Sequence, residues 1–529
     1  MSSSLQEASR KTPGWADKPQ IWLNQIIRTR KRSKLIAMVC LTFVFACAYI
    51  FLAPISKEPE SFLIIARRLG ISSFNKDSCS KSAAHSFSPI LQQPTRIPKA
   101  SNPPNQTSSP PVSGSTGTTL DNIVFGIGAS AETWDQHGQR YTKLWWKPGK
   151  MRGYVWLDEP VENWPNFPDS LPPIRISETT SQFNFTNRFG PPSAIRISRI
   201  VSETYRLNLP NVHWFVMGDD DTVFFTENLV QVLAKYDHNL FHYIGSNSES
   251  HRQTHDFSTD MAFGGAGFAI SHVLAKAFER MQDSCLHRYP HLYGSDERVH
   301  ACISELGVPL TKEPGFHQID IRGDAFGFLS AHPLTPLLSL HHLSAIDPLF
   351  PTMSQDKALL HLLNAAHVDP SGILQQSICY DKKRSWSMSV SWGYAVQVYR
   401  GILPSRELQN PMRTFATWKG SPDHIEFNFR TRPLPDDPCL HPIRFYLESV
   451  EHGGDHHSTT MYKRAKAMTN NCIWETASPT TLDSILVLKE KASTTWFKVP
   501  HRQCCDLTCS NANHLQIHVG SCREGEIIA

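Results

Sequence analysis

The stretch FVMGDDDTVF, residues Phe215–Phe224, decides how the chain folds. Its run of aromatic and β-branched residues predicts a buried strand, which leads directly into Asp219, Asp220 and Asp221. In an extended chain, residues two apart point the same way. We therefore expect Asp219 and Asp221 to converge, while Asp220 faces elsewhere.

Two convergent carboxylates at the end of a strand suit a hard divalent cation such as Mg²⁺ or Mn²⁺. In open α/β sheets, ligands collect at the carboxyl ends of the strands, where this triplet is expected. The alternative is an acidic turn that caps the next helix, because an Asp-x-Asp pattern often arises by chance. The triplet alone leaves both interpretations open.

Length and charge limit the class of protein. A chain of 529 residues exceeds one ordinary domain and can bury a sizeable core. The formal net charge of +4 is small for this length, so nothing argues for a nucleic-acid partner. A hydrophobic content of 40% argues against wholesale disorder.

The N-terminus has the pattern of a membrane anchor. Residues 1–34 are polar and end in a basic cluster, and Leu35–Ala53 carries no charged residue. A bilayer core needs about 20 apolar residues, and the positive-inside rule puts residues 1–34 in the cytosol. A cleaved signal peptide fits poorly because the apolar run starts too far in and is long. A buried core helix is the other alternative.

The segment that follows predicts a spacer. Residues 54–120 form a predicted stem, and residues 86–119 are rich in Pro, Ser, Thr and Gly with few large apolar side chains. Such a composition cannot repay the entropy of ordering. We expect a globular body beyond it, on the far side of the membrane.

Cysteine usage agrees with that orientation. Of the 12 cysteines, only Cys40 and Cys47 lie in the predicted anchor, and the others lie where oxidation is allowed. Six crowd into the end of the chain: Cys439, Cys472, Cys504, Cys505, Cys509 and Cys522. Zinc is the alternative, but paired C-x-x-C spacing is absent. We predict a disulfide-rich extension over residues 351–529, with the pairing left open. Asn105 and Asn184 begin glycosylation sequons.

Residues 121–350 alternate strand and helix patterns. The predicted strands are Ile123–Gly128, Gly153–Glu159, Ile174–Ile176, Val212–Met217 and His242–Ser246. The predicted helices between them are Glu132–Trp146, Pro191–Leu207 and Glu227–Tyr236. This alternation predicts an α/β domain whose mainly parallel sheet has helices on both faces.

A glycine-rich motif, FGGAGFAIS, occupies Phe263–Ser271. Gly264 and Gly265 allow the backbone to come close to a ligand or to another element. A tight strand-to-helix turn is the alternative. We expect Ser271 to cap a helix that continues to about His287.

A second motif, YGSDERVH, precedes another helical pattern. Ser295 is expected to cap this helix, with Asp296 and Glu297 in its first turn. The acids could serve only the helix dipole. Alternatively, one of them at a cleft could accept a proton from an attacking hydroxyl.

Taken in order, DDD, FGGAGFAIS, GSDE with ELGVPL, and GFH resemble the fringe-related β-1,3-glycosyltransferases (GT31-type) over residues 121–350. The chain is most similar to the fringe-like group formerly described only as a domain of unknown function. The resemblance implies a GT-A fold, a Rossmann-like mixed sheet with helices on both faces. It also implies a type II Golgi membrane protein with a UDP-sugar donor and a glycan or glycoconjugate acceptor.

The same resemblance assigns site residues. Asp221, supported by Asp219, would bind Mn²⁺ (or Mg²⁺) against the donor diphosphate, and a histidine would complete the metal site. His341 in SLHHL is the first choice for that histidine, with His317 and His342 as alternatives.

Further roles follow from the resemblance. Asp296 matches the catalytic base, and Glu297 is the alternative. Asp158 or Glu159, at the end of an early strand, would lie near the nucleotide. Asp220, Gly264 and Gly265 would line the donor site.

The implied reaction is a single displacement that inverts the anomeric centre and gives a β-linkage. One competing hypothesis is a catalytically idle relative that binds glycans or scaffolds transferases. A metal-dependent phosphohydrolase is another, but it explains neither the glycine motif nor the stem.

Beyond residue 351, Ser385–Tyr399 alternates like one half-buried strand. Trp386, Trp392 and Trp418 could be core residues or a platform for an acceptor sugar.

Overall fold

The computed structural model describes residues 117–162, 169–419, 425–454, 456–465, 472, 477–511 and 513–528. The predicted tail, anchor and nearly all of the predicted stem, with Asn105, lie outside the described residues. The described residues belong to one compact unit. Within them, no helix is both long and apolar enough to cross a bilayer.

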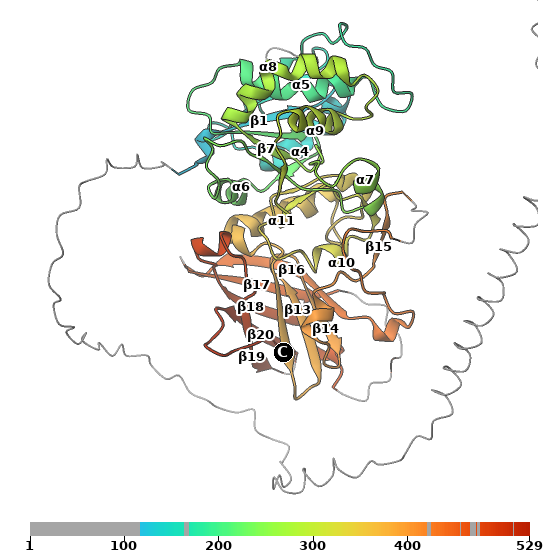
Figure 1. The fold of residues 1–529 in the computed structure, drawn as a ribbon. Coiled ribbons are helices and arrows are strands. Elements are labelled where there is room, and N and C mark those ends of the chain that lie inside the picture. The colour runs from blue at the N-terminus through green and yellow to red at the C-terminus, as the bar shows by residue number, and fades with distance from the viewer. Residues whose placement is uncertain are drawn as a thin grey trace, which may run out of the picture. The chain divides into compact units, whose positions relative to one another are not determined.

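A seven-stranded mixed sheet forms the first half of the body (Figure 1). Its spatial order is β3-β2-β1-β4-β7-β6-β8. The strands are β1 (Ile123–Gly128), β2 (Arg152–Leu157), β3 (Ile174–Ile176), β4 (Trp214–Asp219), β6 (Tyr243–Gly245), β7 (Phe268–Ser271) and β8 (Leu310–Lys312). The first four neighbours run parallel, and β7 is antiparallel to β4 and β6. A mixed sheet of this kind fits the expected GT-A fold.

Helices cover both faces of this sheet, as predicted. Alternate residues of β1 belong to two separate apolar clusters, Phe125 to one and Val124 to the other. The cluster of Phe125 includes residues from a first set of helices, which contains a π-helical turn. The cluster of Val124 includes residues from a second set. The first set comprises α3 (Ala131–Thr133), η2 (Trp134–Gly138), α4 (Gln139–Trp145) and α6 (Thr226–Leu233); the second comprises α5 (Ser193–Arg206), α8 (His272–Arg288) and α9 (Ser295–Glu305).

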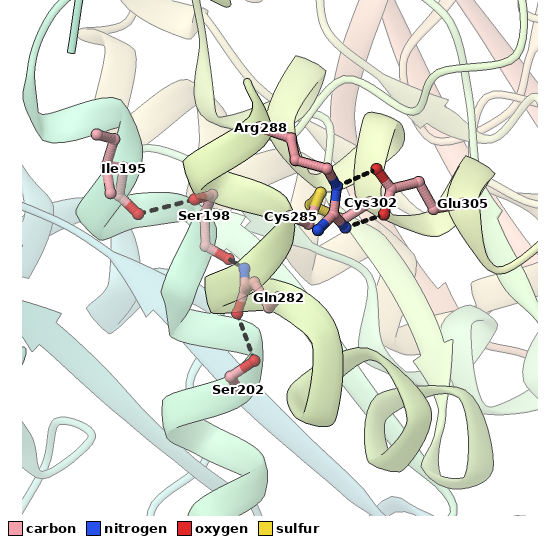
Figure 2. Close-up of a disulfide and its surroundings, with 8 residues drawn as sticks. All are labelled: Ile195, Ser198, Ser202, Gln282, Cys285, Arg288, Cys302 and Glu305. Carbon is pink, nitrogen blue, oxygen red and sulfur yellow. Dashed lines mark hydrogen bonds and ion pairs between the residues drawn. A yellow bond between two sulfur atoms is a disulfide. The ribbon is translucent and has the colours of Figure 1, made fainter. Parts of the chain in front are cut away.

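Helices α5, α8 and α9 are fastened to one another (Figure 2). A disulfide joins Cys285 of α8 to Cys302 of α9. The Gln282 side chain donates to the carbonyl oxygen of Ser198 at 2.6 Å and accepts from the Ser202 hydroxyl, which links α8 to α5. Because α9 begins at the predicted catalytic acids, these bonds fix where those acids lie.

Two small sheets extend the body. One has three strands in the order β5 (Val223–Phe224), β11 (Ser339–Leu340) and β9 (Phe316–His317). The other pairs β10 (Ile321–Gly323) with β15 (Phe415–Thr417). The remaining short helices are α7 (His251–Asp256), α10 (Phe326–Leu329) and α12 (Ser405–Leu408), with 3-10 turns at Leu120–Asn122, Leu343–Ala345, Pro370–Gly372, Pro438–Leu440, Pro479–Thr481 and Thr494–Phe497.

The second half of the chain begins with α11 (Gln355–Val368), which contacts both α4 and β16, and contains an eight-stranded sheet (Figure 1). Its spatial order is β12-β13-β14-β16-β17-β18-β20-β19. The strands are β12 (Gln376–Asp381), β13 (Trp386–Ser391), β14 (Ala395–Arg400), β16 (Ile443–His452), β17 (His457–Arg464), β18 (Ser484–Glu490), β19 (Cys504–Asn511) and β20 (His514–Gly520).

The predicted disulfides are present in this half. Among the described residues of this half, the disulfides are Cys379–Cys505, Cys439–Cys472 and Cys504–Cys522. The bond Cys379–Cys505 joins β12 to β19, the first and last strands of the sheet order, and these two strands are in contact. The sheet is therefore closed on itself through this bond.

Three local predictions were wrong. Ser385–Tyr399 is a hairpin of β13 and β14 rather than one strand, because the chain reverses at Gly393, whose φ is +75°. Both strands are buried along nearly their whole length rather than half-buried. Ser295 does not cap α9, because Gly294 is the N-cap residue of this helix. Ser271 is the N-cap residue of α8, as predicted, although its hydroxyl accepts from the backbone N–H of His242 and makes no cap hydrogen bond with α8.

Candidate active site

An open cleft of about 800 Å³ lies at the carboxyl ends of β1 and β4. The acidic triplet lines it together with the loop after β1, the loop before α5 and the start of α9. Trp418 and Lys419, from the second half of the chain, also line it. Residues from distant parts of the sequence therefore meet at the strand ends, where the sequence predicted a ligand site.

The triplet sits in a tight turn at the end of β4. The backbone N–H of Asp219 donates to the Thr222 hydroxyl at 2.9 Å, and this hydroxyl donates to the carbonyl oxygen of Gly265 at 2.7 Å. Thr222 therefore joins the acidic turn to the glycine motif. It is a site residue that the sequence analysis missed, although it directly follows the triplet.

Asp219 and Asp221 converge as predicted, and His341 joins them. One ligand atom from each of these three residues lies within 4.8 Å of the others. His341 Nε2 is 2.9 Å from Asp221 Oδ1 and 3.8 Å from Asp219 Oδ2. Two carboxylates and one imidazole are a donor set that suits Mn²⁺, so the residues fit the expected ion.

The protonation of this cluster is strongly perturbed. Burial alone would lower the pKa of His341, but the negative charges of Asp221 and Asp219 outweigh it and raise this pKa to about 9. Burial would raise the pKa of Asp221, but His341 holds it at about 2. Burial and the negative charges of Asp221 and Asp296 raise the pKa of Asp219, although the charge of His341 opposes this rise. Because 40% of the Asp219 side chain is exposed, water moderates the rise. Without a cation, the cluster is an ion pair.

Asp220 points away from this cluster, as expected from its position in the strand. Its side chain lies against Gly138 in the π-helical turn, and its Oδ1 is 3.7 Å from His137 Nε2. Burial raises the pKa of Asp220 to about 6. Its backbone N–H donates to the carbonyl oxygen of Gly128, so it braces the turn against β1. The predicted contact between Asp220 and the nucleotide-sugar donor stays a prediction.

Gly264 and Gly265 each make room for a site side chain. A Cβ atom on Gly265 would fall within the imidazole of His341, and one on Gly264 would lie 2.7 Å from Oδ1 of Asp296. The sequence left open whether the motif approaches a ligand or another element. The structure brings it against protein side chains, those of the metal cluster and of the predicted base.

Asp296 and Glu297 have different environments at the start of α9. Both line the cleft, and the Oδ1 of Asp296 accepts from the neighbouring Ser295 hydroxyl at 2.8 Å. Glu297 Oε2 accepts from the backbone N–H of Tyr293 at 2.7 Å, which holds the loop before the helix. This geometry favours Asp296 over Glu297 for chemistry in the cleft.

Three more of the predicted residues, Asp158, Glu159 and His317, neither line the cleft nor join the cluster. Asp158 follows β2 and accepts from the backbone N–H groups of Ala131 and Glu159, so it fixes the loop after β1. Glu159 is exposed. His317 is buried, with Nδ1 3.0 Å from Glu249 and Nε2 2.9 Å from His332. His341 is therefore better placed than His317 as the third ligand.

His342, the other alternative, turns away from the cluster. Its Nδ1 lies 3.1 Å from Asp320 Oδ1, and its ring stacks on Trp418. Asn184 is exposed, as a sequon acceptor must be. Trp386 and Trp392 are core residues, whereas Trp418 is half-buried at the cleft.

Arg196 of α5 is another residue that the sequence analysis missed. Its guanidinium donates to the carbonyl oxygens of Ala129 and Trp156, which follow β1 and lie in β2. Burial lowers its pKa. Arg196 therefore joins two strand ends at the cleft. A helical arginine on an otherwise buried face is the only signal the sequence offered.

Two family models match the chain. The model described as Fringe-like matches residues 176–323. The model described as a protein of unknown function, DUF604, matches residues 253–505. No curated protein matches. The Fringe-like match contains the acidic triplet, the glycine motif and Asp296, and the second match contains His341 and Trp418. With the mixed sheet and the acidic cleft, these matches show that the chain is similar to fringe-like proteins, which is consistent with a fringe-related glycosyltransferase family.

Proposed function

We propose that this protein is a metal-dependent, inverting glycosyltransferase. It would transfer a sugar from a UDP-sugar to a hydroxyl of a glycan or glycoconjugate, forming a β-linkage that is β-1,3 by analogy with fringe-related enzymes. The observation that carries the proposal is the convergence of Asp219, Asp221 and His341 in the cleft that Asp296 also lines.

The metal cluster supplies the electrostatic part of the proposal. A divalent ion bound there would neutralise the charge that develops on the leaving diphosphate. Asp219, Asp221 and His341 would hold it, and His341 would give up its proton to do so. The cleft volume of about 800 Å³ leaves room for a nucleotide sugar.

Asp296 supplies the proton transfer. The acceptor hydroxyl gives its proton to a carboxylate oxygen of Asp296 while its oxygen attacks the anomeric carbon. The bond from that carbon to the phosphate oxygen breaks on the opposite face, and UDP departs with the bonding electrons. The Ser295 hydroxyl and the space beside Gly264 orient the Asp296 carboxylate for this step.

We also propose a location for the protein. Residues 35–53 would anchor it in the Golgi membrane as a single-pass type II protein, with the body in the lumen. The basic cluster before the apolar run and the four disulfides of the described residues support this orientation. The donor would approach the loop after β1, which lines the cleft and is held by the hydrogen bond from the Ala131 backbone N–H to Asp158.

The decisive experiment is a screen of the full-length protein, purified in detergent, for Mn²⁺-dependent hydrolysis of UDP-sugars. Release of UDP from one donor that disappears with a chelator is the expected result. An idle, glycan-binding relative would bind a glycan array without releasing UDP from any donor. UDP release that is unaffected by Asp296→Asn and Asp221→Asn would contradict the assigned site.

A further inference from the structure

The residue next to the third predicted ligand has an uncommon backbone conformation. His342 follows β11 and His341, and its φ of 49° and ψ of 30° lie in the left-handed region. Residues other than glycine rarely adopt this conformation without support from their surroundings. The chain turns here, immediately after His341 has been directed at Asp219 and Asp221.

Three neighbours hold the His342 ring. Its Nδ1 is 3.1 Å from Oδ1 of Asp320, a buried carboxylate that also accepts from the Ser248 hydroxyl. One face stacks on Trp418, with ring centroids 4.4 Å apart and planes 3° apart. The His341 ring lies 3.9 Å away, centroid to centroid.

Trp418 comes from the second half of the chain. It directly follows β15, which pairs with β10 and is thereby fixed to the segment that contains Asp320. The Arg322 guanidinium lies over the Trp418 ring, 4.9 Å from its centroid. The indole is therefore held by a strand pair and by a cation, and its ring lies against His342 at the cleft.

We propose that Trp418 is a positioning residue for the metal cluster. Its ring holds the ring of His342, and this contact stabilises the left-handed turn that directs His341 Nε2 at the two carboxylates. The second half of the chain would thus take part in binding the ion, although none of its side chains belongs to the cluster. This inference rests on the proposed function only in requiring that the cluster bind a divalent cation.

The test measures Mn²⁺ affinity of the full-length protein without any donor, by electron paramagnetic resonance of the free ion. The Asp221→Asn variant shows how much Mn²⁺ the protein binds outside the proposed site. Trp418→Leu should weaken site binding by about 10–100-fold, the range found when a residue that supports a metal ligand is removed. Trp418→Phe keeps a stacking ring and should remain close to the wild type.

Phe429→Leu is a matched control. Phe429 is a half-buried aromatic residue of the same segment, and it packs on Phe328, Phe415 and Phe427. Its replacement should cost a similar loss of melting temperature without metal and should leave Mn²⁺ affinity unchanged. This control separates general destabilisation from a specific effect on the site.

A double-mutant cycle tests the route through His342. His342→Ala has no ring but, unlike glycine, still needs support to adopt the left-handed turn, so it should weaken Mn²⁺ binding about as much as Trp418→Leu does. In the His342→Ala background, Trp418→Leu should then have no further effect. Equal losses from Trp418→Leu in both backgrounds would overturn the proposal.

The remaining outcomes are also decisive. Wild-type Mn²⁺ affinity in folded Trp418→Leu overturns the role of Trp418 and leaves the proposed function intact. If Trp418→Leu does not fold, His342→Ala decides alone: weakened binding supports the proposal and wild-type binding overturns it. Wild-type protein that binds no more Mn²⁺ than Asp221→Asn overturns both the metal site and this inference.

Discussion

A Cβ atom on Gly265 would lie 2.1 Å from Cε1 of His341, so the backbone of the glycine motif forms the surface on which this imidazole rests. The neighbouring Gly264 has the same relation to the carboxylate of Asp296. Two adjacent glycines thus accommodate the two chemical groups of the proposed reaction. A substitution at one of these glycines should therefore displace either His341 or Asp296 without displacing the other.

Gly265→Ala should act on metal binding and Gly264→Ala on transfer. The methyl group of Gly265→Ala displaces His341, so Mn²⁺ affinity should fall about 10–100-fold. Gly264→Ala displaces Asp296 and should lower turnover by about 10²-fold while Mn²⁺ affinity stays near the wild-type value. Calorimetry with Mn²⁺ and initial rates measure the two effects. Identical profiles in the two variants would contradict the separate roles.

Asp221→Asn and Asp296→Asn should also fail in different ways. Asp221→Asn removes a charge from the metal cluster, so both Mn²⁺-dependent UDP binding and transfer should weaken. Asp296→Asn cannot accept a proton, so transfer should fall by about 10²–10⁴-fold while UDP affinity is kept. Full activity in Asp296→Asn would exclude it as the base, and Glu297 would be tested next.

Glu203 in α5 gives a pH dependence of stability that is separate from the cleft. Its buried carboxylate lies 3.3 Å from Arg199, and burial, partly offset by the charge of Arg199, raises its pKa from 4.5 to about 7. The folded state therefore holds a proton more tightly than the unfolded state. The stability from this group is present below pH 4.5 and is lost as the pH rises through 7.

The Glu203→Gln variant tests this assignment. Relative to Glu203→Gln, the wild-type protein should lose free energy of unfolding between pH 5 and pH 8, by up to about 3 kcal/mol. Chemical denaturation at several pH values measures the difference. Parallel curves for the two proteins would show that Glu203 does not titrate in this window.

The Cys285–Cys302 disulfide should stabilise the helices that hold Asp296. Replacing both cysteines by serine should lower the free energy of unfolding by about 3 kcal/mol, as expected for a bond that closes a short loop. Denaturation without reductant measures this loss. The difference between variant and wild type should shrink when both are measured with reductant, and a difference unchanged by reductant would point to packing instead.

The proposed topology predicts the outcome of protease treatment of sealed microsomes. Protease should trim only the N-terminal tail and spare everything beyond about residue 60, because the body would lie in the lumen. Detergent should make the body accessible and serves as the control. A body cleaved in sealed microsomes would contradict both the lumenal orientation and the proposed glycosylation of Asn184.

Much of the fold was predictable from hydrophobic patterns. The buried strands of the first sheet are continuous apolar runs bounded by turn residues, and Ile174–Ile176 has the predicted bounds. The hairpin of β13 and β14 was not predictable, because its turn at Gly393 lies among apolar residues. Its alternating serines suggested a solvent face, yet Ser391 is buried and donates to the carbonyl oxygen of Leu329.

The parts of the site that consist of residues close together in the sequence were predictable. Asp219 and Asp221 follow from strand periodicity, and His341 from the resemblance. The partners of Gly264 and Gly265 did not follow, because they depend on how β11 and α9 pack against the motif. The contact between Trp418 and His342 depends on the pairing of β15 with β10, which joins segments far apart along the chain.

Cys504 and Cys505 are adjacent in β19 but bond in different directions, to Cys522 and to Cys379 of β12. Successive side chains of a strand point to opposite faces, so a slip of β19 by one residue would exchange the two sulfur atoms. A slipped strand would turn Cys504 towards β12 and leave Cys505 on the wrong side for Cys522. In the oxidising compartment proposed for the body, disulfide formation would therefore check strand alignment, and a misaligned chain would carry a distinct cross-link that disulfide isomerases could undo.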